Sequence, residues 1–184
     1  MVFLLYWFVS GLSVKPTQER NWNEGGFRWV IIGIVIAVLF PKIVLLPKIF
    51  GLSIPFLTLS LISHSALLSV ASVALVITGL VVALVARRTL AGNWSRYVEI
   101  KVDHELITVG IYRYVRHPIY TGVLLMAFGN VLLIGTMNVL LVFLAMLGFF
   151  WFKARQEEKV LTKHFPKEYP VYKNDTKALI PFVW

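Results

Sequence analysis

The sequence predicts an all-α, multi-pass transmembrane helical bundle. Of its 184 residues, 58% are hydrophobic and 15% are charged, whereas soluble domains average about 45–50% and about 25%. Residues 49–86 and residues 118–152 contain no Asp, Glu, Lys or Arg. Such continuous apolar stretches are typical of membrane helices, because barrel strands alternate apolar and polar residues. This composition excludes a soluble enzyme, a disordered tail and a free nucleic-acid-binding domain.

A membrane-spanning helix needs roughly 20 apolar residues, and both long stretches exceed that length. Gly51 and Pro55 interrupt the first, and the sequence Gly-Thr-Met-Asn at residues 135–138 is a turn signal inside the second. The second stretch is therefore predicted to form a helical hairpin. The five predicted spans are, in order, residues 1–14, 29–49, 66–86, 119–134 and 139–152. The first is short, and the second carries a kink near Pro41.

The charges agree with this topology. Residues 15–28, 87–117 and 153–184 carry 3, 6 and 7 basic residues, which is 16 of the 18 in the chain, and all nine acidic residues. The connecting loops 51–65 and 135–138 carry no charge. The positive-inside rule places the three charged segments in the cytoplasm. The net charge of +9 is interpreted as contact with anionic lipid headgroups, not with nucleic acid.

Any chemistry is expected at the cytoplasmic face, because the spans contain no Asp or Glu. Polar residues gather in two clusters, residues 104–120 and residues 153–172. The hairpin should bring His117 at its entrance close to Glu157 and Glu158 after its exit, since packed helices lie about 8–10 Å apart. The alternative is that both clusters are interfacial anchors and salt bridges, as in a small transporter subunit or a membrane scaffold.

Metal and thiol chemistry are not predicted. The chain has no cysteine, so disulfides and cysteine-ligated metal sites are excluded. His64 and His164 stand alone in the sequence, without the spacing of a metal-binding motif. No metal is therefore expected among the cofactors.

The polar clusters carry a recognisable order of motifs. These are Gly92-Asn93-Trp94-Ser95, Gly110-Ile111-Tyr112, Arg116-His117-Pro118-Ile119-Tyr120, Glu157-Glu158, and a tail with Phe165, Tyr169 and Tyr172. In this combination the chain resembles the isoprenylcysteine carboxyl methyltransferase family, whose superfamily also includes phospholipid N-methyltransferases and small prokaryotic membrane methyltransferases. The resemblance covers roughly residues 92–172. It implies a division into N-terminal membrane spans, residues 1–86, and a methyltransferase core, residues 87–184.

The resemblance implies that the chain binds S-adenosyl-L-methionine in a cytoplasmic pocket built by the last hairpin and its flanks. Carried over residue by residue, the cofactor-binding residues are His104, Glu105, Leu106, Ile107, Tyr112, His117, Pro118, Ile119, Tyr120, Glu157 and Glu158.

The residue types suit this donor. Glu157 or Glu158 can accept from its ammonium in a charge-assisted hydrogen bond. Tyr112 and Tyr120 offer aromatic faces for the adenine or the sulfonium. His117 or a neighbouring arginine can hold the donor's carboxylate or a ribose hydroxyl.

The expected methyl acceptor is a small lipophilic or amphiphilic molecule or a lipid. Its reactive head would lie beside Lys153 and Arg116, which favours a carboxylate slightly over an amine or a thiol. Some family members have an arginine where this chain has Lys153, four residues before Glu157. Lysine keeps the positive charge but loses the bidentate fork for a carboxylate.

A second enzyme class carries similar C-terminal patterns, namely NADPH-dependent membrane reductases of the sterol or steroid type. The 2′-phosphate of NADPH requires a basic pocket. In this chain Arg87 with Arg88, or Arg113 with Arg116, could supply it.

Overall fold

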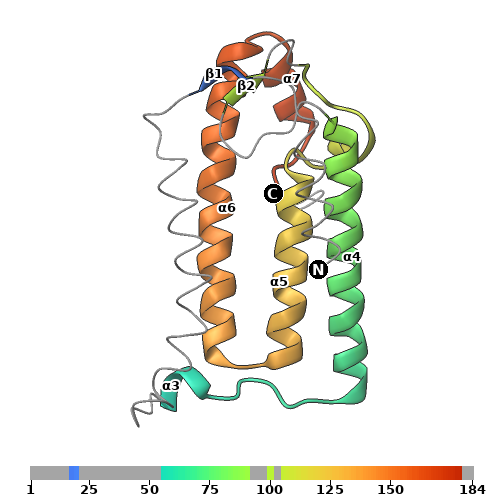
Figure 1. Ribbon diagram of the computed structural model, residues 1–184, viewed down its shortest axis with the longest axis vertical. Coiled ribbons are helices and arrows are strands. Elements are labelled where there is room, and N and C mark those ends of the chain that lie inside the picture. Colours follow the sequence, from blue (N-terminus) through green and yellow to red (C-terminus); the bar gives the residue numbers. More distant parts are fainter. Residues whose placement is uncertain (1–16, 21–54, 92–98, 102–104, 180–184) are drawn as a thin grey trace.

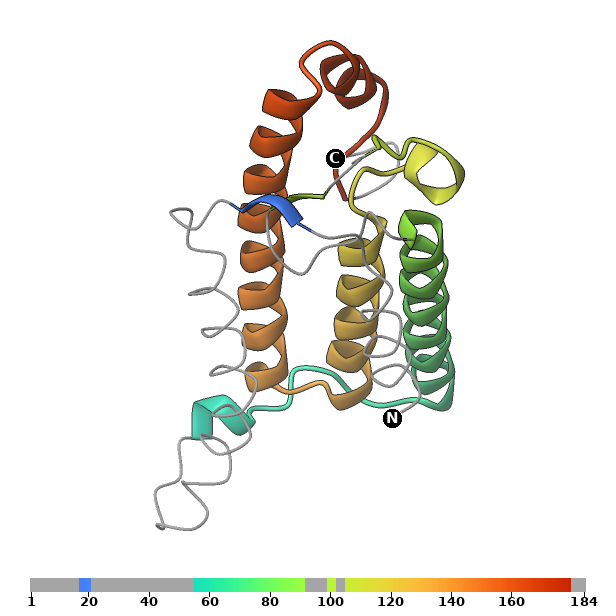
Figure 2. The same cartoon turned by 45° about the horizontal axis from the view of Figure 1, so that its top comes forward.

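A computed structural model describes residues 17–20, 55–91, 99–101 and 105–179. Its frame is three long helices side by side: α4 (Ala66–Leu90), α5 (Pro118–Ile134) and α6 (Met137–His164), with α5 in the middle (Figure 1). The short helix α3 (Pro55–Thr58) lies at one end of this bundle, and the 3₁₀ turn η3 (Gly110–Arg113) and α7 (Glu168–Asp175) lie at the other (Figure 2). The predicted helical bundle is thus observed for the described part of the chain.

Helix α4 begins where the sequence predicted the third span. The hydroxyl of Ser65 caps it by accepting a hydrogen bond from the amide of Leu68 at 3.2 Å, which satisfies one of the free amides of a first turn. The helix continues to Leu90, four residues beyond the predicted end at Ala86. The extra turn carries Arg87 and Arg88, and basic side chains are favourable at a helix C-terminus.

Helices α4 and α5 pack with their backbones close together. A Cβ atom added at Gly122 of α5 would lie 2.5 Å from the carbonyl oxygen of Gly79 and 2.7 Å from the amide nitrogen of Ala83, both on α4. A Cβ at Gly129 would lie 2.9 Å from the carbonyl oxygen of Ser72. Small residues at these positions let membrane helices approach without a layer of side chains between them.

The predicted hairpin between α5 and α6 is present, and its turn is shorter than the predicted 135–138, because α6 already begins at Met137. Helix α5 ends at Ile134 and is capped by Gly135, whose φ of +66° is the left-handed conformation that glycine adopts without strain. The loop between α3 and α4 packs against this turn. The amide of Leu61 donates to the carbonyl of Gly135 at 2.7 Å, and the amide of Met137 donates to the carbonyl of Leu59 at 3.0 Å.

Helix α6 is longer than the sequence predicted. The predicted span ended at Phe152, but the helix runs unbroken to His164. Its 28 residues extend about 42 Å, more than the roughly 30 Å of a bilayer's hydrocarbon core. Residues 153–164 contain no Gly or Pro, so nothing stops the helix where the apolar stretch ends. Glu157 and Glu158 therefore lie on the same rigid helix as the span.

The described residues also contain two short strands that the all-α prediction did not include. Strand β1 (Thr17–Arg20) pairs antiparallel with β2 (Glu99–Lys101), with Thr17 opposite Lys101 and Arg20 opposite Glu99. They lie at the same end of the bundle as α7 (Figure 1). This two-stranded sheet leaves the helical character of the molecule unchanged.

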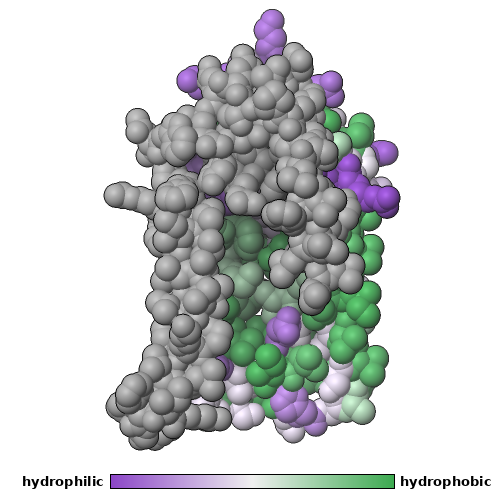
Figure 3. Space-filling model, viewed as in Figure 1, coloured by the Kyte–Doolittle hydropathy of each residue, from purple (hydrophilic) through white to green (hydrophobic). Residues whose placement is uncertain are grey.

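Two of the described helices, α4 and α6, are long and apolar enough to cross a membrane, and α5 is a shorter apolar helix. Large apolar side chains on α4 are exposed, for example Leu67 at 81% and Val70 at 67%. In Figure 3, green apolar side chains make up much of the described surface in the lower half of the view, as expected for a face in contact with lipid. The predicted spans 1–14 and 29–49 lie outside the described residues, so the count of five remains a prediction.

Candidate functional site

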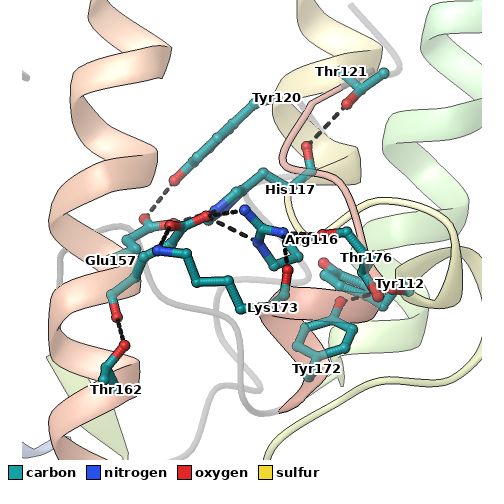
Figure 4. A network of polar contacts seen from close by, with 11 residues as sticks. Tyr112, Arg116, His117, Tyr120, Thr121, Glu157, Thr162, Tyr172, Lys173 and Thr176 are labelled. Atoms are coloured by element: carbon teal, nitrogen blue, oxygen red, sulfur yellow. Dashed lines mark hydrogen bonds and ion pairs between the residues drawn. The ribbon is translucent and has the colours of Figure 1, made fainter. Parts of the chain in front are cut away.

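A polar cluster forms where α5 begins beside α6, at the end of the bundle that carries α7. His117 is the residue before the first turn of α5, where Pro118 occupies the position that favours proline. Glu157 and Glu158 project from α6. Figure 4 shows His117 and Glu157 converging with Arg116 and Lys173, which come from the loop before α5 and from α7. The predicted meeting of His117 with the acidic pair is confirmed.

Glu157 faces the start of α5. Its Oε1 atom accepts a hydrogen bond from the hydroxyl of Tyr120, and its Oε2 atom lies 3.4 Å from Nδ1 of His117. Nζ of Lys153, one turn earlier on α6, lies 4.0 Å from Oε1 and 5.4 Å from the centre of the Tyr120 ring. The carboxylate thus joins an aromatic ring, an imidazole and a lysine at one point.

Glu158 faces the other way, toward the C-terminal part of the chain. Its Oε1 atom accepts a hydrogen bond from Nε of Arg116 at 2.9 Å and lies 2.8 Å from Nη2 of the same guanidinium. Its Oε2 atom lies 2.7 Å from Nζ of Lys173. Two adjacent glutamates therefore have different sets of partners.

His117 lies between the two glutamates and is buried. Its ring stacks on that of Tyr120, with centres 5.4 Å apart and planes inclined by 4°. Nε2 lies 3.5 Å from Oε1 of Glu158 and makes no hydrogen bond to the residues that the structure describes. Burial alone lowers the pKa of His117, but the carboxylates of Glu157 and Glu158 outweigh burial and raise that pKa above its usual value.

Residues 176–179, the C-terminal segment, lie against the chain just before α5. The amide of Arg116 donates to the carbonyl of Lys177 at 2.8 Å, and the amide of His117 donates to the carbonyl of Ala178 at 3.0 Å. The hydroxyl of Thr121 donates to the carbonyl of Leu179 at 2.6 Å. The backbone around His117 is therefore held by a segment about 60 residues later in the sequence.

Two tyrosines, one buried and one half-buried, connect the elements at this end of the bundle. The hydroxyl of Tyr172 on α7 donates to the carbonyl of Tyr112 in η3 at 2.6 Å, and the hydroxyl of Tyr112 donates to the carbonyl of Ala86 on α4 at 3.4 Å. Burial raises the pKa of Tyr112 and of Tyr172 far above its usual value. Both phenols therefore remain protonated and serve as hydrogen-bond donors that join η3 to α4 and α7.

The other predicted cofactor-binding residues, and Arg155, differ in burial and position. His104 lies outside the described residues. Glu105 is exposed, and no described hydrogen bond or ion pair links it to the cluster, while Leu106, Ile107 and Ile119 are half-buried and Pro118 is buried. Arg155 points away from the cluster, over the ring of Trp151 at 4.7 Å.

Sequence reasoning missed the roles of Lys173 and Thr176 in this cluster. Nη1 of Arg116 donates to the carbonyl of Lys173 at 3.0 Å and also to the carbonyl of Thr176. Neither residue belongs to a recognisable motif, and a lysine near a C-terminus usually faces solvent. No signal in the sequence marked them.

Comparisons with known proteins all match methyltransferases. The family model described as phospholipid methyltransferase matches residues 67–168. A protein-S-isoprenylcysteine O-methyltransferase of Saccharomyces cerevisiae is 38% identical over 112 residues, which are 59% of this chain and 47% of the yeast protein. A probable protein-S-isoprenylcysteine O-methyltransferase of Oryza sativa subsp. indica is 32% identical and matched over 59% of each chain.

A solved structure resembles this one. It is described as the eukaryotic intramembrane Ras methyltransferase, an isoprenylcysteine carboxyl methyltransferase, and it superposes with a TM-score of 0.60 at 26% sequence identity. The match covers 89% of this chain and 54% of that one. The chain thus spans about half the length of the relatives it matches.

Proposed function

The chain belongs to the phospholipid methyltransferase family, and from that premise we propose that it is an integral membrane methyltransferase that uses S-adenosyl-L-methionine. The resemblance noted on its motifs is confirmed by the matches to isoprenylcysteine methyltransferases. The proposed acceptor is a small lipophilic or amphiphilic molecule, and the proposed site is the polar cluster between α5 and α6. Charge distribution supports a cytoplasmic position for this end of the bundle.

The observation that carries the proposal is the placement of Glu157. Its carboxylate lies at the end of an apolar helix pair and is shared by Tyr120, His117 and Lys153. These groups fit the donor: a carboxylate suits the ammonium, and the Tyr120 ring suits a sulfonium or an adenine. Nε2 of His117 faces Glu158 at 3.5 Å but makes no hydrogen bond to the described residues. His104, Glu105, Leu106, Ile107, Tyr112, Pro118 and Ile119 are proposed as further contacts.

When bound, S-adenosyl-L-methionine supplies an activated methyl group on a sulfonium. The residues of this chain then have to bind, orient and exclude water, because positioning accounts for much of the acceleration in such a displacement. Glu157 and Tyr120 would hold one end of the donor. A carboxylate or thiolate acceptor needs no general base, so no residue is assigned to proton transfer.

Lys153 is the residue best placed to orient an acceptor. It lies at the end of the apolar part of α6, over the Tyr120 ring and beside Glu157, and its ammonium favours a carboxylate acceptor. Arg116 was predicted to share this role, but its guanidinium is engaged with Glu158 and the end of α7. An acceptor with an apolar tail would gain about 0.8 kcal/mol per methylene transferred from water into the bilayer or the site, so its chain would concentrate it at the membrane boundary.

Calorimetry on the detergent-purified protein tests the donor. S-adenosylhomocysteine should bind, and Glu157→Gln should weaken this binding by about 1.5–3 kcal/mol, the value of a hydrogen bond to a charged group. Glu168→Gln is the matched control, because Glu168 is an exposed carboxylate at the start of α7. Equal affinity in the parent and in Glu157→Gln would contradict the assignment.

The same experiment tests the reductase alternative. Binding of NADPH without binding of S-adenosylhomocysteine would overturn the proposal. The structure gives NADPH little support, because Arg87 is buried and donates to the carbonyl of Ala91 at 2.8 Å, and Arg116 is engaged with Glu158.

The acceptor is identified by incubating the protein with a labelled methyl donor and host membrane lipids. Label found only in water-soluble products would contradict a lipophilic acceptor.

A further inference from the structure

The carboxylate of Glu158 already has a cation on each side. Arg116 engages Oε1 through two of its nitrogens, and Lys173 lies 2.7 Å from Oε2. The Glu158 side chain is 6% exposed, compared with 21% for Glu157. A ligand's ammonium would have to displace a cation to reach Glu158, whereas Glu157 offers a more accessible carboxylate.

Arg116 connects this carboxylate to the end of α7. While Nε and Nη2 face Glu158, Nη1 donates to the carbonyls of Lys173 and Thr176. The planar guanidinium has donors in fixed directions, so one side chain sets the distance between α6 and the start of the C-terminal segment. Lys173 adds a second connection from α7 to the same glutamate.

The C-terminal segment in turn holds the backbone next to the site. Its carbonyls at Lys177 and Ala178 accept from the amides of Arg116 and His117. His117 is the residue whose ring contacts Glu157 and stacks on Tyr120. Anything that releases the segment therefore also releases the backbone that orients the imidazole.

We propose that Arg116, Glu158 and Lys173 form a clamp that holds residues 176–179 against the start of α5 and thereby positions His117 in the donor site. Within the acidic pair, Glu157 binds the methyl donor directly, and Glu158 is a positioning residue that acts through Arg116. This refines the proposed function and rests on it, because it assigns different roles to two residues that the sequence grouped together.

The decisive variant is Lys173→Met, because this side chain is half exposed and its loss should leave the bundle folded. The chain has no cysteine, so Ala178→Cys supplies a single reporter whose labelling by a maleimide measures release of the segment. In this background, Lys173→Met should speed labelling and weaken S-adenosylhomocysteine binding about two- to fivefold, the range for a partly exposed ion pair. Lys173→Arg keeps the charge and should restore both values.

Lys159→Met is the matched control. Lys159 is exposed, follows Glu158 directly in the sequence, and forms no ion pair with the residues that the structure describes. Its removal changes the net charge by the same amount and should alter neither labelling nor affinity. An equal effect of the two variants would mean that charge alone is responsible and would overturn the clamp.

A direct role for Glu158 predicts the opposite result. If Glu158 contacted the donor, removing Lys173 would make its carboxylate freer, and affinity would stay the same or increase. The double variant Glu158→Gln/Lys173→Met should bind S-adenosylhomocysteine no worse than whichever single variant binds it more weakly, because both changes open the same clamp. Glu157→Gln combined with Lys173→Met should instead lower the affinity by the sum of the two separate effects. If the parent does not bind S-adenosylhomocysteine, the proposed function fails, and unchanged labelling in Lys173→Met would then overturn the clamp by itself.

Discussion

Among the described helices, α5 packs against α4 on one side and α6 on the other, and the two interfaces differ. Against α4 its backbone is so close that a Cβ at Gly79 would lie 2.5 Å from the carbonyl oxygen of Gly122. Against α6 it is separated by aromatic rings, with Tyr120 4.8 Å from Phe150 between ring centres and Phe128 5.5 Å from Phe143. The close interface leaves no room for a ligand. The wide one ends in the polar cluster, so the glycine interface fixes the frame and the aromatic interface provides the site.

The largest expected effect comes from adding a side chain where α4 and α5 are in close backbone contact. Gly122→Ala places a methyl group against backbone atoms of Gly79 and Ala83, which cannot move away as a side chain can. Overpacking typically costs about 1–3 kcal/mol, and we expect the upper end of that range. The measurement is the unfolding temperature in detergent.

Gly148→Ala on α6 is the control for this substitution. Among the residues that the structure describes, a Cβ at Gly148 meets nothing within 4 Å, and alanine is favoured over glycine inside a helix by about 1 kcal/mol. The control should therefore be neutral or stabilising. Equal destabilisation by both changes would contradict the contrast between the two interfaces.

A smaller effect is expected from Tyr120→Phe, which probes the wide interface. Phenylalanine keeps the stacking on Phe150 and removes the hydrogen bond to Glu157. The fold should persist, while affinity for S-adenosylhomocysteine falls by about 0.5–1.5 kcal/mol. Tyr114→Phe is the control, because Tyr114 is 56% exposed. Lost stability with unchanged affinity would show that the hydroxyl serves the fold and not the site.

The smallest effect is a pH dependence of stability that belongs to the wide interface. The neighbouring carboxylates raise the pKa of His117 in the folded chain above 6.5. Its contribution to stability is therefore fully present below 6.5 and is lost as the pH rises through the raised folded value. The difference in unfolding temperature between the parent and His117→Gln should shrink from pH 6 to pH 9. A difference that grows with pH would contradict the sign.

The hairpin and the position of the site could be predicted because both depend on local sequence. Two apolar stretches of similar length, separated by a glycine that can adopt a positive φ, must return the chain to the face it left. His117 and Glu157 sit at the two ends of that hairpin, so their meeting followed from counting residues. The end of α6 could not be read in the same way, since hydropathy marks where the bilayer ends and not where the helix ends.

What the sequence by itself determined, then, is the class of the molecule, its hairpin and the residues at the membrane boundary, because composition and spacing fix which segments lipid can accommodate. Only the tertiary structure decided which glutamate binds which partner. Arg116 reaches Glu158 across 42 residues and Thr176 across 60. Adjacent glutamates on one helix point in different directions, and only the packing of α5, α6 and α7 sets which cations each carboxylate meets.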